Sequence, residues 1–320
     1  MKVEDPVYGS YTVEEDVLEE LVGSDPVQRL KHVSQAGPPE YFLDKPSITR
    51  FEHSLGVMHL LEEFGAPLEE QVAGLLHDTP HTAFSHAVDF VFETEDHEYH
   101  EDFLEEVVMD SDIPRILERH GFDTGYILDE DNFPLLERDL PDLCADRIDY
   151  FLREAEIGQG WDAGRFLDHL DGDRYVLDDR DTGEEYALKY IEADENAWAN
   201  PEEVAVFHLF ARSLRRALEE EVLEEKDLFG TDEQVYRRMK GSGSERVLEP
   251  LERLENGFKA VIDGENPDFV EETKVRYVDP VVVDGGEEVR VTDYSEKVRD
   301  RIREHREFVE GGYPLRIVDG

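Results

Sequence analysis

The sequence predicts a mainly α-helical protein with a smaller α+β region toward its C-terminal end, and three observations lead to this fold class. Apolar residues recur at helical spacing throughout residues 1–170. After Gly172 the pattern changes to short alternating runs, which are typical of strands, with further helical stretches between them. Apolar residues make up 39% of the chain, and the 17 Phe, 13 Tyr and 2 Trp are spread along it, which argues against disorder of the whole chain.

The first part of the chain is expected to be a helical bundle. In its first helix, Val13, Val17 and Leu21 fall on one stripe with carboxylates between them. The AGPPE turn ends the second helix, and an extended piece follows at 41–43. The helices expected in this part span 13–22, 27–35, 49–64, 68–77, 84–92, 98–109 and 136–157.

The C-terminal part is expected to be a compact α+β region packed on the bundle. Tyr175, Leu177, Tyr186 and Leu188 alternate on either side of a DTG turn, which predicts a β-hairpin. The other elements expected are helices at 201–225, 234–239 and 295–308, strands at 275–278, 281–283 and 289–291, and a last apolar run at 315–318. A chain of 320 residues corresponds to about two domains of ordinary size, and we place them at 1–170 and 171–320.

The charge balance is strongly acidic, with 33 Lys+Arg against 81 Asp+Glu and a formal net charge of −48. Only nine of the basic residues are Lys. Such a field repels DNA and anionic membranes, so neither is expected as a partner. Acid excess with few Lys is typical of a halophilic protein, because concentrated counterions screen the self-repulsion and hydrated carboxylates keep the chain soluble.

Cysteine usage and hydropathy point to an intracellular protein. Cys144 is the single cysteine, so the chain can form neither an intramolecular disulfide nor a zinc or iron–sulfur site built from several cysteines. The first nine residues lack the apolar region of a signal peptide, and no window approaches the roughly 18 apolar residues of a membrane span. We therefore expect a soluble, cytoplasmic protein.

Histidines are concentrated in one stretch of the chain. Seven of the 12 lie within 48 residues, where even spreading would place about two: His53, His59, His77, His81, His86, His97 and His100. Clustered imidazoles and carboxylates can bind a divalent cation and leave neighbouring groups for proton transfer. A single histidine is more often a core or surface residue than a metal ligand. The prediction of a metal site therefore rests on the arrangement of several histidines.

The spacing suggests how one ion could be bound. His77 and Asp78 are adjacent at the end of a helix, where both side chains can face the same ion because the chain stops being helical. His53 lies on the preceding helix, and Asp146 offers a ligand from a distant one. Residues four and eight positions after Asp146 share its helix face, and these are Tyr150 and Glu154.

At these residues the chain resembles the HD-domain phosphohydrolases, whose metal ligands follow the order H…HD…D. RFEHSLGV, LLHDTPHTAFSH, YHE and ADRIDYF are similar to blocks of the deoxynucleoside triphosphate triphosphohydrolases of that superfamily, over about residues 26–190. The resemblance implies an HD-domain helical bundle and a divalent metal ion, which could be Mn, Mg, Fe, Co, Ni or Zn. The ligands that it implies are His53, His77, Asp78 and Asp146.

The resemblance also implies roles for further residues. The catalytic positions are His81, His86, Asp89 and His100, with Asp89 orienting His86. Phosphate contacts are implied for Arg50, Arg147 and Arg180, contacts around the sugar for Gln35, Tyr150 and Glu154, and stacking on the sugar for Tyr186. Structural alternatives stay open: Arg50 and Arg147 could pair with the abundant carboxylates, and Arg180 and Tyr186 could lie on a hairpin without function.

The chain also departs from the family's pattern. Thr79-Pro80 follows the HD pair where Leu or Ile followed by Gly is common, and Glu154 stands where an Asp is usual. ENAWANPEE at 195–203 replaces a basic and aromatic stretch, and GSDPVQRLK at 23–31 matches the activator site only in part. These differences put the downstream phosphate contacts and the regulation by a nucleotide in doubt.

Three functions follow from this interpretation. The leading hypothesis is hydrolysis of a deoxynucleoside triphosphate to a deoxynucleoside and triphosphate, with His86 or His100 protonating the leaving oxygen. The second keeps the metal site but acts on a monophosphate, a cyclic nucleotide or a signalling nucleotide, and it is favoured if Arg180 and Tyr186 lie away from the metal. The third is a nucleotide-sensing protein without catalysis. A homo-oligomer is a further expectation from the resemblance.

The acidic composition yields a prediction about salt. Activity should rise with KCl into the molar range, because counterions screen the carboxylates around the basic groups that bind a polyanionic substrate. Initial rates measured across a KCl series test this, and loss of activity above about 0.2 M would contradict it.

Overall fold

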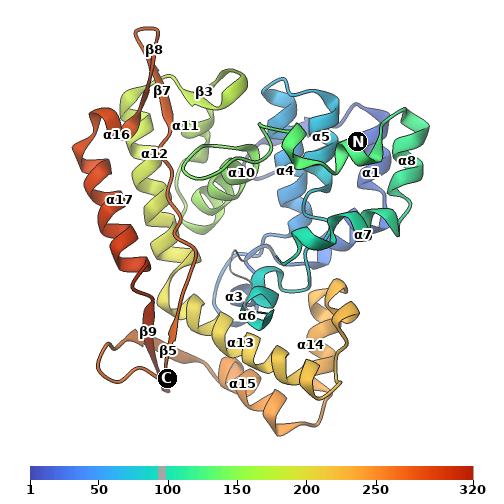
Figure 1. The fold of residues 1–320 in the computed structure, drawn as a ribbon, viewed down its shortest axis with the longest axis vertical. Coiled ribbons are helices and arrows are strands. Elements are labelled where there is room, and N and C mark those ends of the chain that lie inside the picture. The colour runs from blue at the N-terminus through green and yellow to red at the C-terminus, as the bar shows by residue number, and fades with distance from the viewer. Residues whose placement is uncertain (93–98, 320) are drawn as a thin grey trace.

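The computed structural model describes residues 1–92 and 99–319, so His97 lies outside the described residues. The fold is mainly α-helical, with small sheets concentrated in the C-terminal part, as the sequence predicts (Figure 1). Within the described ranges, none of the helices combines the length and the apolar character that crossing a membrane requires.

Two central helices carry most of the site. Helix α4 (Arg50–Glu63) and helix α5 (Leu68–Leu76) match the predicted helices at 49–64 and 68–77. The start of α4 is fixed by a capping box, in which Thr49 and Glu52 each bond the other's backbone N–H group. Helix α10 (Ala145–Arg153) packs across α4. These three helices come together in the middle of the molecule (Figure 1).

Shorter elements surround this centre. An N-terminal hairpin of β1 (Lys2–Asp5) and β2 (Gly9–Thr12) was not predicted. Helix α3 (Pro38–Phe42) replaces the extended piece predicted at 41–43, since the two prolines of its first turn are preorganised for a helix start. The remaining helical segments before α10 are α1 (Asp16–Val22), α2 (Asp25–Arg29), η1 (Leu30–His32), η2 (Ser85–Val88), α6 (Asp89–Phe92), η3 (Glu101–Phe103), α7 (Leu104–Met109), α8 (Ile113–His120), α9 (Thr124–Ile127) and η4 (Glu130–Asn132).

The helix predicted at 136–157 begins only at Ala145 and continues as a π-helical turn, η5 (Glu154–Gly158). The backbone N–H groups of Leu135 and Leu136 donate to the buried carboxylate of Glu70 instead of entering a helix. Pro141 also lacks the N–H group that a helix interior needs. The chain before α10 is therefore irregular.

The hairpin predicted over 174–190 is wrong for most of its length. Only β3 (Leu170–Asp171) and β4 (Val176–Leu177) pair there, and Arg180 begins the long helix α12 (Arg180–Ala193). Asp179 caps this helix by accepting from the Thr182 N–H group. Tyr186 and Tyr190 are four residues apart and both are buried. The buried residues therefore follow the period of a helix and not the alternation expected of a strand.

The C-terminal part alternates helices and short strands. Its helical segments are α11 (Ala163–Leu167), η6 (Gly172–Arg174), η7 (Asp194–Trp198), α13 (Pro201–Glu219), η8 (Glu225–Phe229), α14 (Asp232–Lys240), α15 (Glu245–Asn256), α16 (Val291–Tyr294) and α17 (Glu296–Val309). Strands β5 (Phe258–Ile262), β9 (Tyr313–Asp319) and β6 (Phe269–Glu271) form one antiparallel sheet in that order. Strands β7 (Val281–Asp284) and β8 (Glu287–Arg290) extend the β3–β4 pair.

Several C-terminal predictions agree with these elements, including the strands at 281–283 and 289–291 and the helix at 295–308. The predicted helix at 201–225 ends earlier, at Glu219, and Glu221 turns the chain with a left-handed φ of 56°. The predicted strand at 275–278 has no strand partner in the part of the chain that the structure describes.

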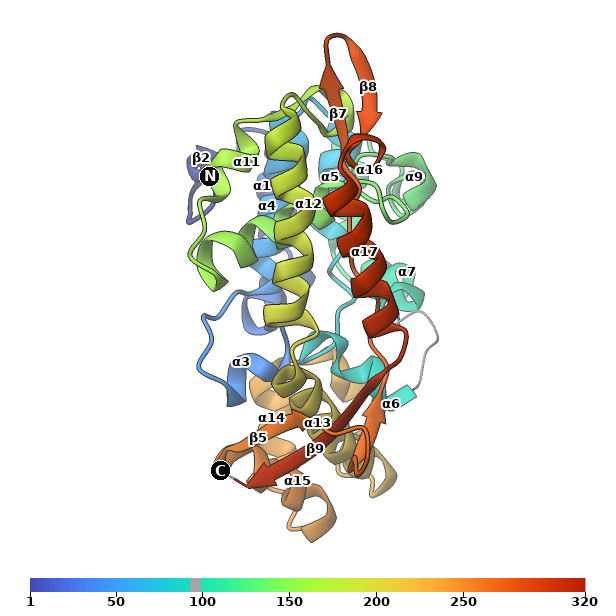
Figure 2. The ribbon, with the colours of Figure 1, turned by 90° about the vertical axis from the view of Figure 1, so that its left-hand side faces the viewer.

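The largest core crosses the proposed domain boundary. It joins Leu55 and Phe151 to Ile191 of α12 and Val298 of α17. A second core lies between α13, α14 and α15 and includes Phe84 from the chain that follows α5. Figure 2 shows α12 and α17 running side by side. The division near residue 170 stays a prediction, and the packing joins the two parts closely.

The close approach of α4 and α10 gives a prediction about stability. A Cβ atom at Gly56 would lie 1.9 Å from Asp149 Oδ1 and 2.2 Å from Arg153 Nη2. Both side chains are buried and paired, so they have little room to move. We expect Gly56→Ala to lower the free energy of unfolding by roughly 1–3 kcal/mol, measured by chemical denaturation.

The matched control is Gly264→Ala, since a Cβ atom there would meet nothing within 4 Å. It should change the free energy of unfolding by less than about 0.5 kcal/mol. Equal stability of the two variants would show that α4 and α10 tolerate a wider separation.

Candidate functional site

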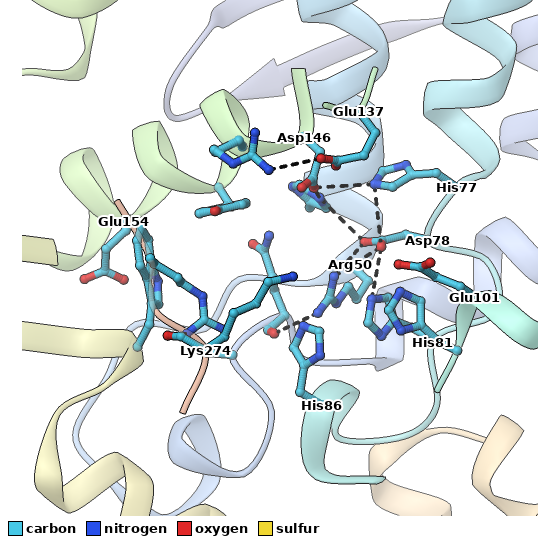
Figure 3. Close-up of a pocket in the computed structure, with 18 of the residues that line it drawn as sticks. Arg50, His77, Asp78, His81, His86, Glu101, Glu137, Asp146, Glu154 and Lys274 are labelled. Atoms are coloured by element: carbon cyan, nitrogen blue, oxygen red, sulfur yellow. Dashed lines mark hydrogen bonds and ion pairs between the residues drawn. The ribbon is translucent and has the colours of Figure 1, made fainter. Parts of the chain in front are cut away.

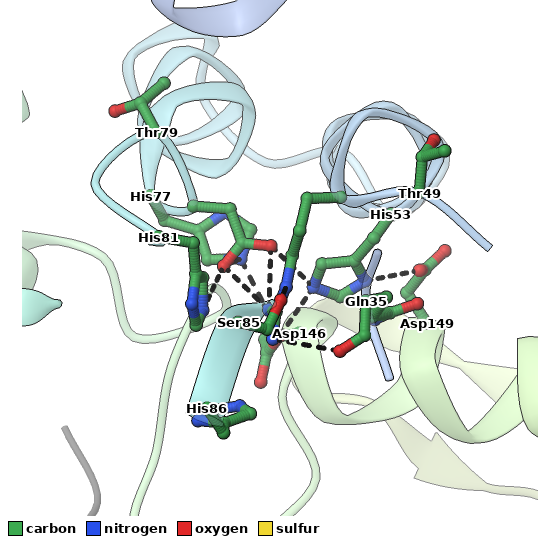
Figure 4. Close-up of polar contacts among 12 residues, drawn as sticks. Gln35, Thr49, His53, His77, Thr79, His81, Ser85, His86, Asp146 and Asp149 are labelled. Carbon is green, nitrogen blue, oxygen red and sulfur yellow. Dashed lines mark hydrogen bonds and ion pairs between the residues drawn. The ribbon is translucent and has the colours of Figure 1, made fainter. Parts of the chain in front are cut away.

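Four side chains from three helices converge at the centre of the fold (Figure 4). His53 comes from α4, His77 and Asp78 from the end of α5, and Asp146 from the first turn of α10. Asp146 Oδ1 lies 2.9 Å from His53 Nε2 and 3.6 Å from His77 Nε2. Asp78 places one oxygen 3.7 Å from His53 Nε2 and the other 3.6 Å from His77 Nε2.

These residues fit a divalent cation. His77 Nδ1 donates to the carbonyl of Gly74 at 2.7 Å, which leaves the lone pair on Nε2. That Nε2 atom is buried and has no hydrogen-bond partner among the described residues. Burial alone would lower the pKa of His53, but hydrogen bonds to Asp146 and Asp149 raise that pKa to about 9. The cluster therefore attracts positive charge, and two imidazoles, which would release their protons when an ion binds, form a suitable ligand set with two carboxylates.

A second layer of residues fixes His53. Asp149 Oδ2 lies 2.7 Å from His53 Nδ1 and accepts from Arg153 Nε at 2.7 Å. Tyr8 of the N-terminal hairpin donates its hydroxyl to Asp149 Oδ1 at 2.8 Å. The sequence analysis missed Asp149, although a carboxylate one helical turn after a ligand on a buried helix could have indicated it. The hairpin thus reaches the cluster through two hydrogen bonds.

Three further histidines lie beside the cluster on the chain after α5. The His81 ring stacks on the His100 ring with centroids 3.6 Å apart. Burial lowers the pKa of His100 to about 3, and burial together with Arg50 holds the pKa of His81 well below its usual range. His86 Nδ1 lies 2.9 Å from Asp89 Oδ2, and its side chain is 36% exposed. Of the three, His86 is therefore best placed to exchange a proton with solvent.

The backbone before His86 is strained. Phe84 and Ser85 have φ angles of 62° and 49°, in the left-handed region that residues other than glycine rarely adopt. The Phe84 N–H group donates to Asp232 at 2.7 Å, and the Ser85 hydroxyl accepts from Arg50 Nε at 2.9 Å. These contacts hold the strained turn that presents His86 to the cluster.

The two arginines predicted to bind phosphate are paired within the protein. Arg50 Nη1 lies 3.1 and 3.0 Å from the two oxygens of Asp78. Arg147 donates to Glu137 at 3.0 Å and to backbone carbonyls of the preceding loop. The pairing with carboxylates that the sequence left open is therefore present, although both residues also line the cavity described next.

The cluster opens into a cavity of about 580 Å³ (Figure 3). Most of the predicted site residues line it: Gln35, Arg50, His53, His77, Asp78, His81, His86, His100, Asp146, Arg147, Tyr150 and Glu154. Asp89 sits behind His86. Tyr150 contacts the edge of Trp198 with centroids 5.0 Å apart, and Glu154 accepts from Gln159 at 2.7 Å.

Arg180 and Tyr186 are the exceptions, because neither is among the described residues that line the cavity. Arg180 begins α12 on the surface, pairs with Asp284 at 2.8 Å and lies over the ring of Tyr294. Tyr186 is fully buried between Phe151 and Phe166. Helix formation in place of the predicted hairpin carries both residues away from the site.

The sequence analysis also missed residues that reach the cavity from the C-terminal part. They are Trp198, Glu203, Phe207, Lys274 and Arg276. Glu203 is buried and accepts from Lys45 Nζ at 2.6 Å. Burial raises the pKa of Glu203 to about 7. The sequence offered no signal that singled out Lys274 and Arg276, because closely spaced basic residues also occur elsewhere, as at Arg237 and Arg238.

A helical fold with a buried H…HD…D cluster at the base of a cavity defines the HD-domain metal-dependent phosphohydrolases, and the chain belongs to this family. Residues 50–154 match the HD domain family. The chain is 39% identical to the uncharacterized protein YdhJ of Bacillus subtilis over 306 residues, covering 93% of this chain and 94% of that protein. It is 31% identical to the metal-dependent phosphohydrolase cns2 of Cordyceps militaris, covering 89% of this chain and 86% of that protein.

Two further similarities are more distant. The human deoxynucleoside triphosphate triphosphohydrolase SAMHD1 is 33% identical over 102 residues, which cover 27% of this chain and 16% of SAMHD1. The solved structure of a phosphohydrolase from Bacteroides thetaiotaomicron superposes over the full length of both chains with a TM-score of 0.74 at 17% sequence identity. That likeness supports the fold.

The contact between Asp149 and His53 predicts an effect on metal binding. Asp149→Asn removes the charge that orients the imidazole and makes it a stronger ligand. We expect the Kd for Mn²⁺ or Co²⁺ to rise roughly ten- to hundredfold, measured by titrating the metal-free protein. Asp129→Asn, at an exposed carboxylate, is the matched control. Equal affinity in the two variants would contradict an orienting role.

Proposed function

We propose that the protein hydrolyses the phosphate ester of a nucleotide that carries a single phosphate, with the reacting phosphate at the cluster of His53, His77, Asp78 and Asp146. The observation that carries this choice is the position of Arg180 and Tyr186. Neither is among the described residues that line the cavity, and this arrangement favours a substrate other than a deoxynucleoside triphosphate.

The charge of the cavity supports the same choice. Among the described residues, five cationic side chains line it, but nine carboxylates line it as well. Arg50 and Arg147 are already paired with Asp78 and Glu137. A triphosphate tail needs several cations along its length, whereas a single phosphate at a metal needs few.

A divalent metal held by these four ligands would polarise the phosphoryl oxygens and make bound water more acidic. His86 would donate a proton to the leaving oxygen, with Asp89 fixing its ring by the contact at Nδ1. Arg50 would lie beside the reacting phosphate, since it is bonded to the ligand Asp78. Tyr150 and Glu154 would face the sugar, and Trp198 offers an aromatic surface for the base.

Hydrolysis of a deoxynucleoside triphosphate is the second candidate. Support for it comes from the similarity to SAMHD1 over 102 residues. The departures at 195–203 and the distant Arg180 weigh against it. The non-catalytic alternative is set aside, because the chain belongs to a family of hydrolases and keeps all four predicted ligands.

The test is a product survey. The purified protein is incubated with nucleoside monophosphates, cyclic nucleotides and deoxynucleoside triphosphates, each with Mn²⁺, Mg²⁺, Fe²⁺, Co²⁺, Ni²⁺ or Zn²⁺. We expect nucleoside and orthophosphate from a monophosphate, resolved by chromatography. The double variant His77→Ala/Asp78→Ala should lose the activity, because half of the ligands are gone.

Each other outcome decides between the candidates. Release of deoxynucleoside and inorganic triphosphate would establish the second candidate in place of the first. Absence of any nucleoside from the monophosphates and triphosphates, and of any monophosphate from the cyclic nucleotides, with every metal would overturn both. The rise of activity with salt, self-association and a cytoplasmic location remain predictions, and the survey is therefore run in both dilute and molar KCl.

A further inference from the structure

We infer that Lys274 and Arg276 bind the phosphate of the substrate, and so supply the cationic contacts that the sequence assigned to Arg180. This inference rests on the proposed function, because it concerns the same cavity. It adds the segment at 272–280, which lies between β6 and β7 and outside the matched HD domain.

The first argument is the alternation of side chains along this segment. Val275 packs against the small core formed by α13 and β9, and Tyr277 packs against the largest core. Lys274 precedes Val275, and Arg276 lies between Val275 and Tyr277. Both cationic residues line the cavity. An extended chain points alternate side chains to opposite sides, so the two apolar contacts fix the direction of the two cations.

The second argument is the direction of Lys274. In Figure 3 its side chain extends from the C-terminal segment into the cavity, between Glu154 and Arg50, toward the histidines and carboxylates of the cluster. The ammonium group thus enters the space in front of the cluster, where a bound phosphate would lie. A flexible stem with three donors suits contact with phosphate oxygens.

The third argument is the anchoring of Arg276. Its Nη1 atom lies 3.6 Å from Asp194 Oδ1, and the Asp194 side chain is fully buried. His305 Nε2 lies 3.0 Å from the other oxygen of the same carboxylate. Asp194 begins the π-helical turn η7, which ends at the cavity residue Trp198. The Asp194 carboxylate therefore holds one side of the Arg276 guanidinium, and Arg276 also lines the cavity.

The composition of the chain also supports a binding role for these two cations. The chain has only nine Lys in 320 residues and a net charge of −48. Lys274 and Arg276 both line a cavity that also contains the predicted metal cluster. They oppose the surrounding carboxylates at the place where an anionic substrate has to enter.

The test measures binding of inorganic phosphate to the Mn²⁺-loaded full chain by calorimetry at constant KCl. We expect Lys274→Gln and Arg276→Gln each to raise the Kd for phosphate roughly tenfold, because each removes one charge-assisted contact. Lys274→Arg should keep most of the affinity. The controls are Lys297→Gln and Arg303→Gln, which remove equal charge from the exposed face of α17.

Steady-state kinetics separate this inference from the proposed function. With the nucleotide found in the product survey, Lys274→Gln should raise KM by about the same factor as the Kd, with a smaller change in kcat. Weaker phosphate binding in the variants would support the inference even if no nucleotide is hydrolysed. Nucleotide hydrolysis with unchanged KM and phosphate affinity in Lys274→Gln would overturn it and leave the proposed function standing.

Lys274 is an exposed residue, so its substitution should leave folding intact. Thermal denaturation of each variant checks this point. Phosphate affinity in Lys274→Gln equal to that in Lys297→Gln would overturn the inference, as would failure of the Mn²⁺-loaded wild-type protein to bind phosphate.

Discussion

The contact between α4 and α10 is the constraint on which the rest of the site depends. Gly56 allows the two helices to approach, and the approach brings Asp146 and Asp149 to opposite nitrogens of His53. Arg153 then compensates the buried charge of Asp149, since an uncompensated carboxylate in the core would be costly. Packing and chemistry are therefore joined in one interface, and a change that separates the helices acts on both.

Acidic composition and an anionic substrate are compatible because charge is distributed unevenly. Much of the excess carboxylate lies on exposed helix faces, where salt screens it within a few ångströms. Inside the cavity, positive charge is supplied locally by arginine, by lysine and by whatever cation the cluster holds. The net charge is therefore a property of the surface, whereas the charge inside the cavity depends on a small set of local contacts.

The sequence predicted the local helices, and its family resemblance added the distant ligand Asp146, but other long-range contacts were missed. The helices holding His53 and His77 follow from the periodicity of their apolar residues. The segment after DTG was predicted as a strand, because Tyr186, Leu188 and Tyr190 fit an alternating period while Tyr186 and Tyr190 also fit a helical one. The cations at 274 and 276 could not be placed, since nothing local shows that their segment crosses the cavity.

The course of the chain around the cavity has a consequence for cooperativity. Wall residues come from positions as far apart as Gln35 and Arg276, and the hairpin at Tyr8 supports them from behind. A ligand that touches both the helical centre and the C-terminal segment binds only when these parts are assembled. By mass action it then stabilises the assembled form against every partly opened one. An occupied cavity would in this way stabilise the contact between the helical centre and the C-terminal segment, which are far apart in the sequence.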